Sequence, residues 1–162
     1  MNFFKTSYQS PVGTLQVICS NDALVALTFL KEGEKEEYTE SNNLTEQTCK
    51  QLKEYFSGER KVFQLPMQQN GTDFQAKVWH LLQTIPYGRT VSYMDLSKSY
   101  GDVKSVRAVA AANGKNNIAI VVACHRVIGS NQTLTGYAGG LWRKHWLLAH
   151  EAKYHAGVQR LF

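Results

Sequence analysis

The stretch VSYMDLSKSYGDVKSVRAVAAANG, Val91 to Gly114, decides the fold of the second half of this chain. Ser92 is a good helix N-cap, and we expect a short helix over Tyr93–Ser99. Gly101 then predicts a tight turn into another helix over roughly Val103–Ala112. Two short helices joined by a glycine-containing turn are typical of a helix-turn-helix.

The second of these helices has one apolar face and one nearly bare face. At about 100° per residue, Val103, Val106, Val109 and Ala110 lie opposite Lys104, Ser105, Ala108, Ala111 and Ala112. A face of alanine and serine lets another surface approach the backbone closely, and Arg107 projects at its edge. Alanine is also the best helix former, so this interpretation stays open. Asn113-Gly114 predicts a left-handed cap at the end of the helix.

A further helix is expected just before this pair. Thr72 and Gln75 form a capping box, and apolar residues then repeat at helical spacing until Pro86-Tyr87-Gly88 must end the helix. The expected buried face consists of Phe74, Val78, Leu81, Leu82 and Ile85. The second half of the chain is therefore predicted to be mostly helical.

The first thirty residues predict a three-stranded antiparallel meander. The expected strands cover Phe3–Gln9, Thr14–Ser20 and Ala23–Leu30, and turn-forming residues separate them. The polar, glutamate-rich segment that follows, Lys31–Asn43, is expected to be a solvated and mobile loop. Because strands come first and helices dominate later, we predict an α/β (α+β) fold.

One helix should pack on this meander. Asn43 with Glu46 predicts a capping box, and Gly58 stops the helical pattern. The apolar repeat consists of Leu44, Thr48, Leu52, Tyr55 and Phe56. From Leu65 to Thr72 the residues are proline, glycine and polar types without periodicity. We therefore expect an N-terminal α/β domain over 1–66, a linker over 67–72 and a C-terminal domain over 73–162.

The charge of the chain changes at the same place. Residues 1–66 carry 7 Lys and Arg against 9 Asp and Glu, and residues 67–162 carry 11 against 4, which gives net charges of −2 and +7. All five histidines are in the second part. Such an excess of positive charge suits a surface that faces polyphosphate, although basic halves also arise for solubility. Charge alone therefore leaves nucleic-acid binding open.

The composition indicates the cellular compartment and whether a metal or cofactor is expected. The sequence has no apolar signal segment at its start and no apolar run long enough to span a membrane, so we expect a cytoplasmic protein. Cys19, Cys49 and Cys124 are too few for a disulfide framework and indicate a reducing compartment. No CxxC or HxxxH spacing exists, so we expect neither a metal site nor a cofactor.

One motif interrupts an apolar, β-rich run that starts at Ile118 and would suit a core strand. In VVACHRVIG, Val121 to Gly129, a cysteine, a histidine and an arginine stand in a row. Cys124 could be a small buried hydrophobe, a metal ligand or a nucleophile. Consecutive strand side chains point to opposite faces, so Cys124 and His125 would make a strained chelating pair.

Here the sequence closely resembles the O6-alkylguanine-DNA alkyltransferases, also called methylated-DNA-protein cysteine methyltransferases. The resemblance rests on blocks in the family's order and spacing: Phe74-Gln75 with Val78-Trp79, Gly88 leading to Val91-Ser92-Tyr93, Arg107-Ala108-Val109, Asn116, CHRVIG, GYAGGL at Gly136–Leu141 and LLAHE at Leu147–Glu151. The first domain matches more loosely, through the turn at Ser10–Leu15 and the helix end at Leu52–Gly58. The resemblance implies a ribonuclease-H-like N-terminal domain and a winged helix-turn-helix C-terminal domain.

The activity that this resemblance implies is direct DNA repair. An alkyl group, such as methyl, would move from O6 of guanine irreversibly to Cys124, once per molecule. Attack needs the thiolate, so some group must lower a thiol pKa of roughly 8.5 by about 2 units. The resemblance implies a chain from Cys124 through a bridging water to His125 and Glu151, with Arg126 in structural salt bridges.

The resemblance also implies how the base and the duplex are held. Tyr93 would act as the acid near the leaving base, and Asn116 would brace the cysteine loop. The base pocket would consist of Tyr137, Ala138 and Gly139. The implied DNA-binding residues are Arg107, Ala108, Ala111, Lys104, Ser92 and Lys115, with Arg89 and Lys98 as further candidates for phosphate contacts. The implied partner is double-stranded DNA contacted in its minor groove by a monomer that flips the damaged nucleotide out, with Arg107 as the wedge.

Two family prolines are absent, which leaves alternatives open. Ala123 stands just before the cysteine and Asn117 follows the asparagine where the family commonly has proline, so we expect a more permissive loop around Cys124. Non-reactive relatives that only bind alkylated DNA characteristically replace the cysteine, which is present here. A Cys-His hydrolase or a winged-helix regulator is the other rival. Whether O4-alkylthymine is also a substrate stays open.

Overall fold

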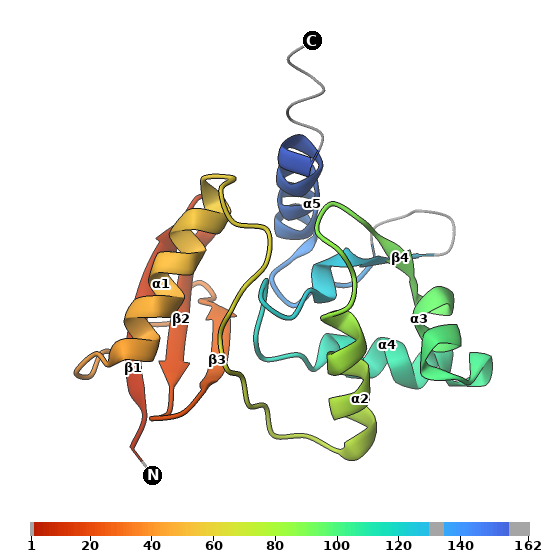
Figure 1. Ribbon diagram of the computed structural model, residues 1–162, viewed down its shortest axis with the longest axis horizontal. Coiled ribbons are helices and arrows are strands. Elements are labelled where there is room, and N and C mark those ends of the chain that lie inside the picture. The colour runs from red at the N-terminus through yellow and green to blue at the C-terminus, as the bar shows by residue number, and fades with distance from the viewer. Residues whose placement is uncertain (1, 130–134, 156–162) are drawn as a thin grey trace. The chain divides into compact units, whose positions relative to one another are not determined.

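The computed structural model describes residues 2–129 and 135–155, and their contacts divide the chain into two compact units (Figure 1). The first unit contains residues 1–69 and 117–119, and the second contains 70–116 and 120 onward. Segment 117–119 was expected in the second domain, but it belongs to the first unit. Both backbone groups of Leu27 bond to this segment: Leu27 N donates to Asn117 O at 2.8 Å, and Leu27 O accepts from Ala119 N at 2.9 Å.

The first unit is built on the predicted three-stranded meander, which the structure confirms. The strands are β1 (Phe4–Ser10), β2 (Gly13–Cys19) and β3 (Leu24–Phe29), antiparallel in the order β1-β2-β3 (Figure 1). Leu15, Val17 and Cys19 alternate along β2 and are fully buried. This alternation is the period-2 pattern that places one face of a sheet in a core.

Helix α1 (Asn43–Phe56) covers one face of this sheet (Figure 1). The capping box exists but lies one residue earlier than expected. Asn42 is the N-cap, its side chain accepts from Thr45 N, and the Thr45 hydroxyl accepts from Asn42 N. With the cap at Asn42, the reciprocal partner is Thr45 rather than Glu46. Phe56 stacks on Tyr8 of β1 at 6.0 Å between ring centroids, which holds the helix to the sheet.

The polar segment after β3 is exposed, as predicted, but it is tied to the sheet. Gln16 is buried on β2, and its side-chain nitrogen donates to Glu37 O at 2.9 Å while its oxygen accepts from Glu37 N at 2.8 Å. Lys5 N also donates to the Thr39 hydroxyl at 2.8 Å. The buried Gln16 amide binds both backbone groups of Glu37 and so restrains this segment. The segment is therefore held to the sheet at these contacts, in contrast to the mobile loop that was expected.

Asn117 uses the backbone donor that a proline would lack. Its N–H donates to Gln69 Oε1 at 2.7 Å within the first unit. Proline has no N–H, so at this position it would leave the Gln69 oxygen without this donor. The departure from the family pattern therefore coincides with a hydrogen bond that only a non-proline residue can form.

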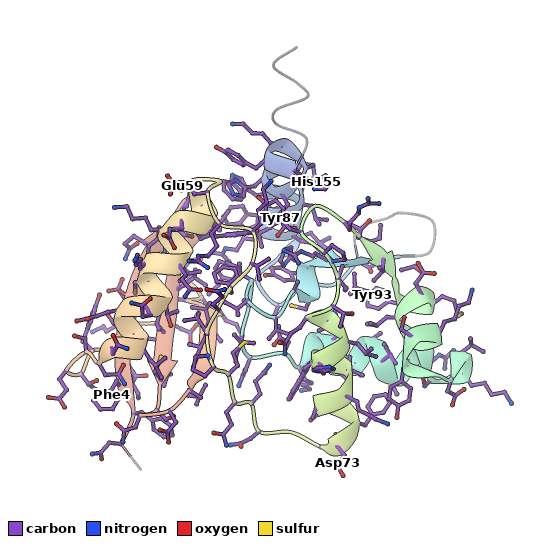
Figure 2. All side chains as sticks on the ribbon, viewed as in Figure 1. Phe4, Glu59, Asp73, Tyr87, Tyr93 and His155 are labelled. Carbon is purple, nitrogen blue, oxygen red and sulfur yellow. The ribbon has the colours of Figure 1, made fainter. Side chains whose placement is uncertain are left out.

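The second unit contains the predicted helix-turn-helix. Its elements are α2 (Asp73–Leu82), β4 (Val91–Ser92), α3 (Tyr93–Tyr100), the 3-10 helix η1 (Val103–Ser105), α4 (Val106–Gly114), the 3-10 helix η2 (Cys124–Arg126), β5 (Val127–Ile128) and α5 (Leu141–His155). Thr72 and Ser92 cap α2 and α3 as predicted, and Gly101, at φ 108°, ends α3 in the left-handed conformation. Strands β4 and β5 pair in parallel. Figure 2 shows Asp73 and Tyr93 at the starts of α2 and α3.

Three details of the helical half differ from the prediction. Helix α2 ends at Leu82, before Ile85. Val103 is 49% exposed and Ala112 only 2% exposed, although the helical wheel placed them on the opposite sides. Residues 103–105 form a 3-10 turn, which breaks the 100° progression and takes Val103 off the buried face of α4. Ala112 lies three residues after the buried Val109 and so shares its face, where Trp79 of α2 binds the Ala112 carbonyl. Gly114 lies within α4 and the C-cap is Lys115, at φ −92°, so the expected left-handed cap is wrong.

The apolar run before CHRVIG is not a core strand. Within it Ile118 forms only an isolated bridge with Leu27 of the first unit, and Ile120 adopts φ 70°. Cys124 N donates to Val122 O at 2.8 Å, which closes a tight turn into η2. The residues are buried as expected, but the chain bends through them instead of extending.

Among residues 2–129 and 135–155, every helix is too short or too polar to cross a lipid bilayer.

A buried tryptophan joins α2 to α4. Trp79 is 5% exposed, and its indole N–H donates to Ala112 O at 2.9 Å near the end of α4. This bond adds a second donor to a carbonyl at the helix end, since Ala112 O also accepts from Lys115 N at 3.1 Å. It therefore fixes the position of α4 relative to α2.

We predict that Trp79→Phe lowers the free energy of unfolding by about 2 kcal/mol, because it removes this hydrogen bond and part of a buried ring. Urea denaturation followed by circular dichroism measures the change. Trp142→Phe is the matched control, since Trp142 is 57% exposed, and it should change stability by no more than about 0.5 kcal/mol. Equal effects of the two substitutions would contradict the role assigned to Trp79.

Candidate active site

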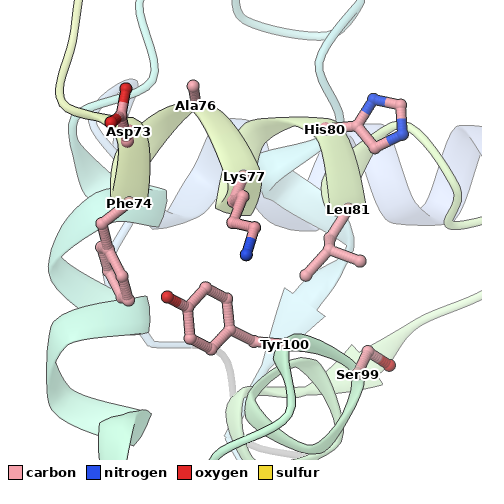
Figure 3. Close-up of a pocket in the computed structure, with 8 residues that line it drawn as sticks. All are labelled: Asp73, Phe74, Ala76, Lys77, His80, Leu81, Ser99 and Tyr100. Carbon is pink, nitrogen blue, oxygen red and sulfur yellow. The ribbon is translucent and has the colours of Figure 1, made fainter.

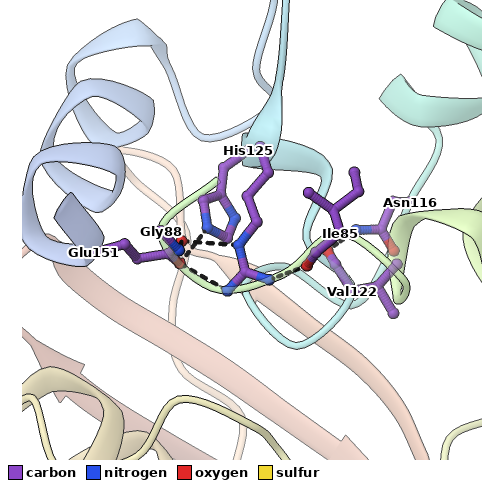
Figure 4. A network of polar contacts seen from close by, with 7 residues as sticks. Ile85, Gly88, Asn116, Val122, His125 and Glu151 are labelled. Atoms are coloured by element: carbon purple, nitrogen blue, oxygen red, sulfur yellow. Dashed lines mark hydrogen bonds and ion pairs between the residues drawn. The ribbon is translucent and has the colours of Figure 1, made fainter. Parts of the chain in front are cut away.

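A single buried carboxylate organises the polar residues of the motif. Glu151, on α5, is 1% exposed. Its Oε2 lies 2.7 Å from His125 Nε2 and 3.0 Å from Arg126 Nη2, and its Oε1 accepts from Arg126 Nε at 2.8 Å and from Gly88 N at 3.3 Å (Figure 4). The structure thus brings together η2, the turn around Gly88 and the last helix.

This arrangement determines the protonation of the pair. Burial alone would raise the pKa of Glu151, but its electrostatic interactions and hydrogen bonds with His125 and Arg126 outweigh burial and hold the pKa well below its usual range. Burial lowers the pKa of His125, against the opposing effect of Glu151, so the imidazole is neutral at neutral pH. Since the carboxylate can only accept, His125 donates from Nε2. The lone pair is therefore on Nδ1, which is buried and has no hydrogen-bond partner within the described residues.

Arg126 forms the structural salt bridge that was expected of it. Besides Glu151 it donates from Nη1 to Ile85 O at 2.7 Å, and its guanidinium lies 5.6 Å from the centre of the Tyr87 ring. Burial, with the nearby Glu151 charge, raises the pKa of Tyr87 to about 12. The sequence did not indicate that Arg126 and His125 share one carboxylate, because that depends on how α5 packs.

The nucleophile candidate is a buried thiol. Cys124 is 7% exposed, and Asn116 donates from Nδ2 both to Cys124 Sγ at 3.2 Å and to Val122 O at 2.9 Å. Burial raises the pKa of Cys124, and the Asn116 hydrogen bond and the Lys144 charge only partly oppose this. The expectation that neighbours lower the thiol pKa is therefore wrong for the resting site, and the proton must leave as the sulfur reacts.

Cys124 opens into a cavity of about 330 Å³ within the second unit. Its lining consists of Tyr93, Ala110, Asn113, Gly114, Asn116, Cys124, Gly136, Tyr137 and Ala138. Five of the expected site residues thus meet there: Tyr93, Asn116, Cys124, Tyr137 and Ala138. Gly139, His125 and Glu151 are not part of the lining, and the last two are buried in the protein.

Two residues near this cavity were not predicted as site residues. Asn113 was interpreted only as part of a helix cap, although its spacing of three from Asn116 places both at the end of α4. Lys144 is fully buried, donates from Nζ to Thr135 O at 2.6 Å and lies 6.0 Å from the centre of the Tyr93 ring. Burial lowers the pKa of Lys144 and the Cys124 thiolate would raise it. A lysine within a helical pattern is usually interpreted as a surface residue, so the sequence around Lys144 does not indicate that its side chain is buried.

The expected DNA-binding residues lie at the surface around η1 and α4. Arg107, Ala108, Ala111, Lys104 and Lys115 are all exposed. Ser92 is half-buried, and its hydroxyl accepts from Asp95 N at 2.9 Å as the cap of α3. The outer face of α4 at Ala108 and Ala111 is therefore accessible, with Arg107 beside it.

A larger hollow, of about 770 Å³, lies elsewhere in the second unit, between α2 and α3 (Figure 3). Phe74 packs edge-on against Tyr100 at 4.9 Å, and Lys77 lies 5.5 Å from the Tyr100 ring centre. It shares no lining residue with the Cys124 cavity, and it contains no thiol. Size alone therefore does not mark the reactive site here.

Comparisons with known proteins agree with this site. Residues 73–153 match the family model of the 6-O-methylguanine DNA methyltransferase DNA-binding domain, and residues 3–69 match that family's ribonuclease-like domain. The fold and the site therefore define a two-domain DNA-binding protein, in which a helix-turn-helix unit with a buried cysteine follows a small sheet domain. The chain belongs to the 6-O-methylguanine DNA methyltransferase family.

Individual relatives are similar over most of their length. The constitutive methylated-DNA–protein-cysteine methyltransferase of Bacillus subtilis is 45% identical over 147 residues, which cover 86% of this chain and 88% of that protein. The crystal structure of the Mycobacterium tuberculosis O6-methylguanine methyltransferase is 39% identical, covers 94% of each chain and gives a TM-score of 0.85. A structure of the Mycobacterium tuberculosis protein in complex with DNA is 40% identical over 91% of this chain and 92% of that chain, with a TM-score of 0.84.

We predict that Glu151→Gln destabilises the protein by about 3 kcal/mol at pH 7, because it leaves the buried Arg126 charge uncompensated. The folded pKa of Glu151 is below its unfolded value, so the stabilisation is present above the ordinary glutamate pKa of about 4.3 and decreases as pH falls further. Urea denaturation at pH 7 and at pH 3 measures both. The difference from wild type should shrink at pH 3. The exposed Glu59→Gln is the control, and a difference that does not depend on pH would contradict the assignment.

Proposed function

We propose that this chain repairs DNA directly by transferring an alkyl group, such as methyl, from O6 of guanine to Cys124. The single observation that carries the proposal is a buried thiol that lines a 330 Å³ cavity and is followed by His125, whose buried Nδ1 has no hydrogen-bond partner within residues 2–129 and 135–155. A cavity of this size suits one extrahelical base. A thioether has no easy reverse, so each molecule is expected to react once.

The bonds of the proposed step balance without a cofactor. Cys124 Sγ attacks the alkyl carbon, the S–C bond forms, the C–O6 bond breaks, and its electron pair remains on guanine. The thiol proton moves to His125 Nδ1, through a bridging water, while Glu151 compensates the imidazolium charge. The guanine then takes up a proton, so the net exchange is a proton for an alkyl group.

The remaining cavity residues would hold and neutralise the leaving base. Tyr93, Tyr137 and Ala138 line the cavity. Tyr93 would act as the acid near the base, and Tyr137 would lie against the base with Ala138 beside it. Lys144 favours the thiolate by its charge and restrains the loop at Thr135. These groups stabilise charge as it develops on sulfur and on guanine.

The exposed face of α4 would meet double-stranded DNA in its minor groove. Ala108 and Ala111 allow the helix to approach closely, and Arg107 would fill the space that the flipped nucleotide leaves. Lys104 and Lys115 would contact phosphates. We further propose that the protein acts as a monomer and that it works in the cytoplasm, and the three free thiols support the second point because they suit a reducing compartment.

Intact-mass spectrometry after incubation with duplex DNA that contains one O6-methylguanine tests the proposal. We expect the protein to gain the mass of one methyl group, on Cys124, and Cys124→Ser to gain none. Tight binding with unchanged mass would instead support a non-reactive sensor. Repeated turnover of small esters would indicate a Cys-His hydrolase, and preference for one undamaged sequence a regulator. A duplex with O4-methylthymine shows in the same assay whether that base is a substrate.

The residue before the cysteine gives a second prediction. Ala123 has φ −80°, close to the range of proline, so Ala123→Pro should fold and gain about 0.5–1 kcal/mol of stability. A stiffer loop should change the single-turnover rate and reduce transfer of benzyl relative to methyl, without moving the reactive site. Ala123→Gly should shift the benzyl-to-methyl ratio in the opposite direction. If neither the rate nor the ratio changes, loop stiffness does not matter.

A further inference from the structure

An exposed tryptophan lies at the start of the last helix, shortly after the loop that lines the Cys124 cavity. Trp142 is 57% exposed, and its neighbour Leu141 is 49% exposed in the same first turn of α5. Residues 136–138 line the cavity, and Trp142 follows them four positions later. Four residues span at most about 14 Å, so the Trp142 backbone lies within that distance of the cavity lining.

The indole lies against a guanidinium that is itself held in place. The Arg143 guanidinium is 4.6 Å from the centre of the Trp142 ring, and Arg143 Nη1 donates to Gly139 O at 2.8 Å. At the next position, Lys144 Nζ donates to Thr135 O at 2.6 Å. Two successive side chains of α5 thus bind the loop, and the Trp142–Arg143 pair is preorganised.

The surroundings of this pair carry positive charge. The only acidic residue in the sequence from 135 to 155 is Glu151, which is 1% exposed and therefore offers no charge to the surface. Arg143 is half-buried and Lys153 is exposed on the same helix. Residues 67–162 together carry 11 Lys and Arg against 4 Asp and Glu, a net charge of +7. A polyanion is therefore the partner whose charge fits this surface.

An unpaired nucleobase fits the aromatic part of the surface. Every base has a π face that stacks on an aromatic side chain, and an adjacent arginine adds a cation–π contribution. Bases within an intact duplex are already stacked on one another, so their faces are not accessible to an indole at the protein surface. A single strand, or a base extruded from a duplex, exposes such a face.

We propose that Trp142 and Arg143 form a stacking platform that binds an unpaired base of DNA outside the Cys124 cavity. The platform adds affinity for single-stranded DNA to the duplex contacts proposed for the exposed face of α4. This inference concerns binding alone, so it goes beyond alkyl transfer and does not require it. Bases of any kind bind to the platform, because stacking reads no hydrogen-bond pattern.

Fluorescence anisotropy of labelled, undamaged oligonucleotides tests the platform with the full chain. The three probes are a single strand, its perfect duplex, and the same duplex with one bulged base. We expect Trp142→Ala to weaken single-strand binding about tenfold and perfect-duplex binding less than about twofold, and Trp142→Phe to retain most of the affinity. Across a salt series, the slope of log Kd against log salt should not change, since Trp142 carries no charge.

The matched control is Leu141→Ala, because Leu141 has a similar exposure in the same turn but no ring to stack. It should change single-strand binding by less than about twofold. Thermal unfolding shows whether each variant is folded. A loss with the single strand alone supports a single-strand platform, and an additional loss with the bulged duplex supports one that also binds extruded bases.

Two results would overturn the inference. One is unchanged single-strand binding by Trp142→Ala, and the other is an equal loss with the single strand and the perfect duplex. Both are independent of the proposed function, which fails only if the protein gains no methyl group on Cys124 from a duplex with O6-methylguanine.

Discussion

The second unit depends on the buried carboxylate of Glu151. Removing a carboxylate from water is costly unless nearly every lone pair is used and an opposite charge lies close by. Here Arg126 supplies the charge through two bonds, and His125 and the Gly88 backbone supply the remaining donors. One side chain of α5 therefore holds both η2 and the turn after α2. It also fixes the imidazole so that the basic nitrogen, Nδ1, is the one left open.

The same packing explains why the resting cysteine is a thiol. Burial that creates a cavity for a base also removes water from around Cys124, which disfavours the thiolate. Asn116 and Lys144 offset only part of this effect. A buried thiol is less open to oxidation and to stray electrophiles than an exposed thiolate. In the proposed transfer, this burial requires a group that takes the proton as sulfur reacts, which is the role that we propose for His125.

Local sequence rules predicted the elements well where the determining contacts are local. The caps at Thr72 and Ser92, the turn at Gly101 and the meander all follow from residues within a few positions of one another. The rules failed where a neighbour in space intervened. Val103 is exposed in a 3-10 turn before α4, Ala112 is buried where Trp79 of α2 binds its carbonyl, and the apolar run after Asn117 bends rather than extends.

By itself the sequence determined the chemical identities: a cysteine next to a histidine, a distant glutamate, a bare helix face with an arginine, and the order of motifs that relates this chain to its family. Only the tertiary structure decided how those groups behave. That His125 and Arg126 share Glu151 and that Lys144 is buried beside Tyr93 both depend on contacts between residues far apart in the chain. Protonation and hydrogen-bonding capacity are set by burial and by spatial neighbours, and no local pattern specifies either.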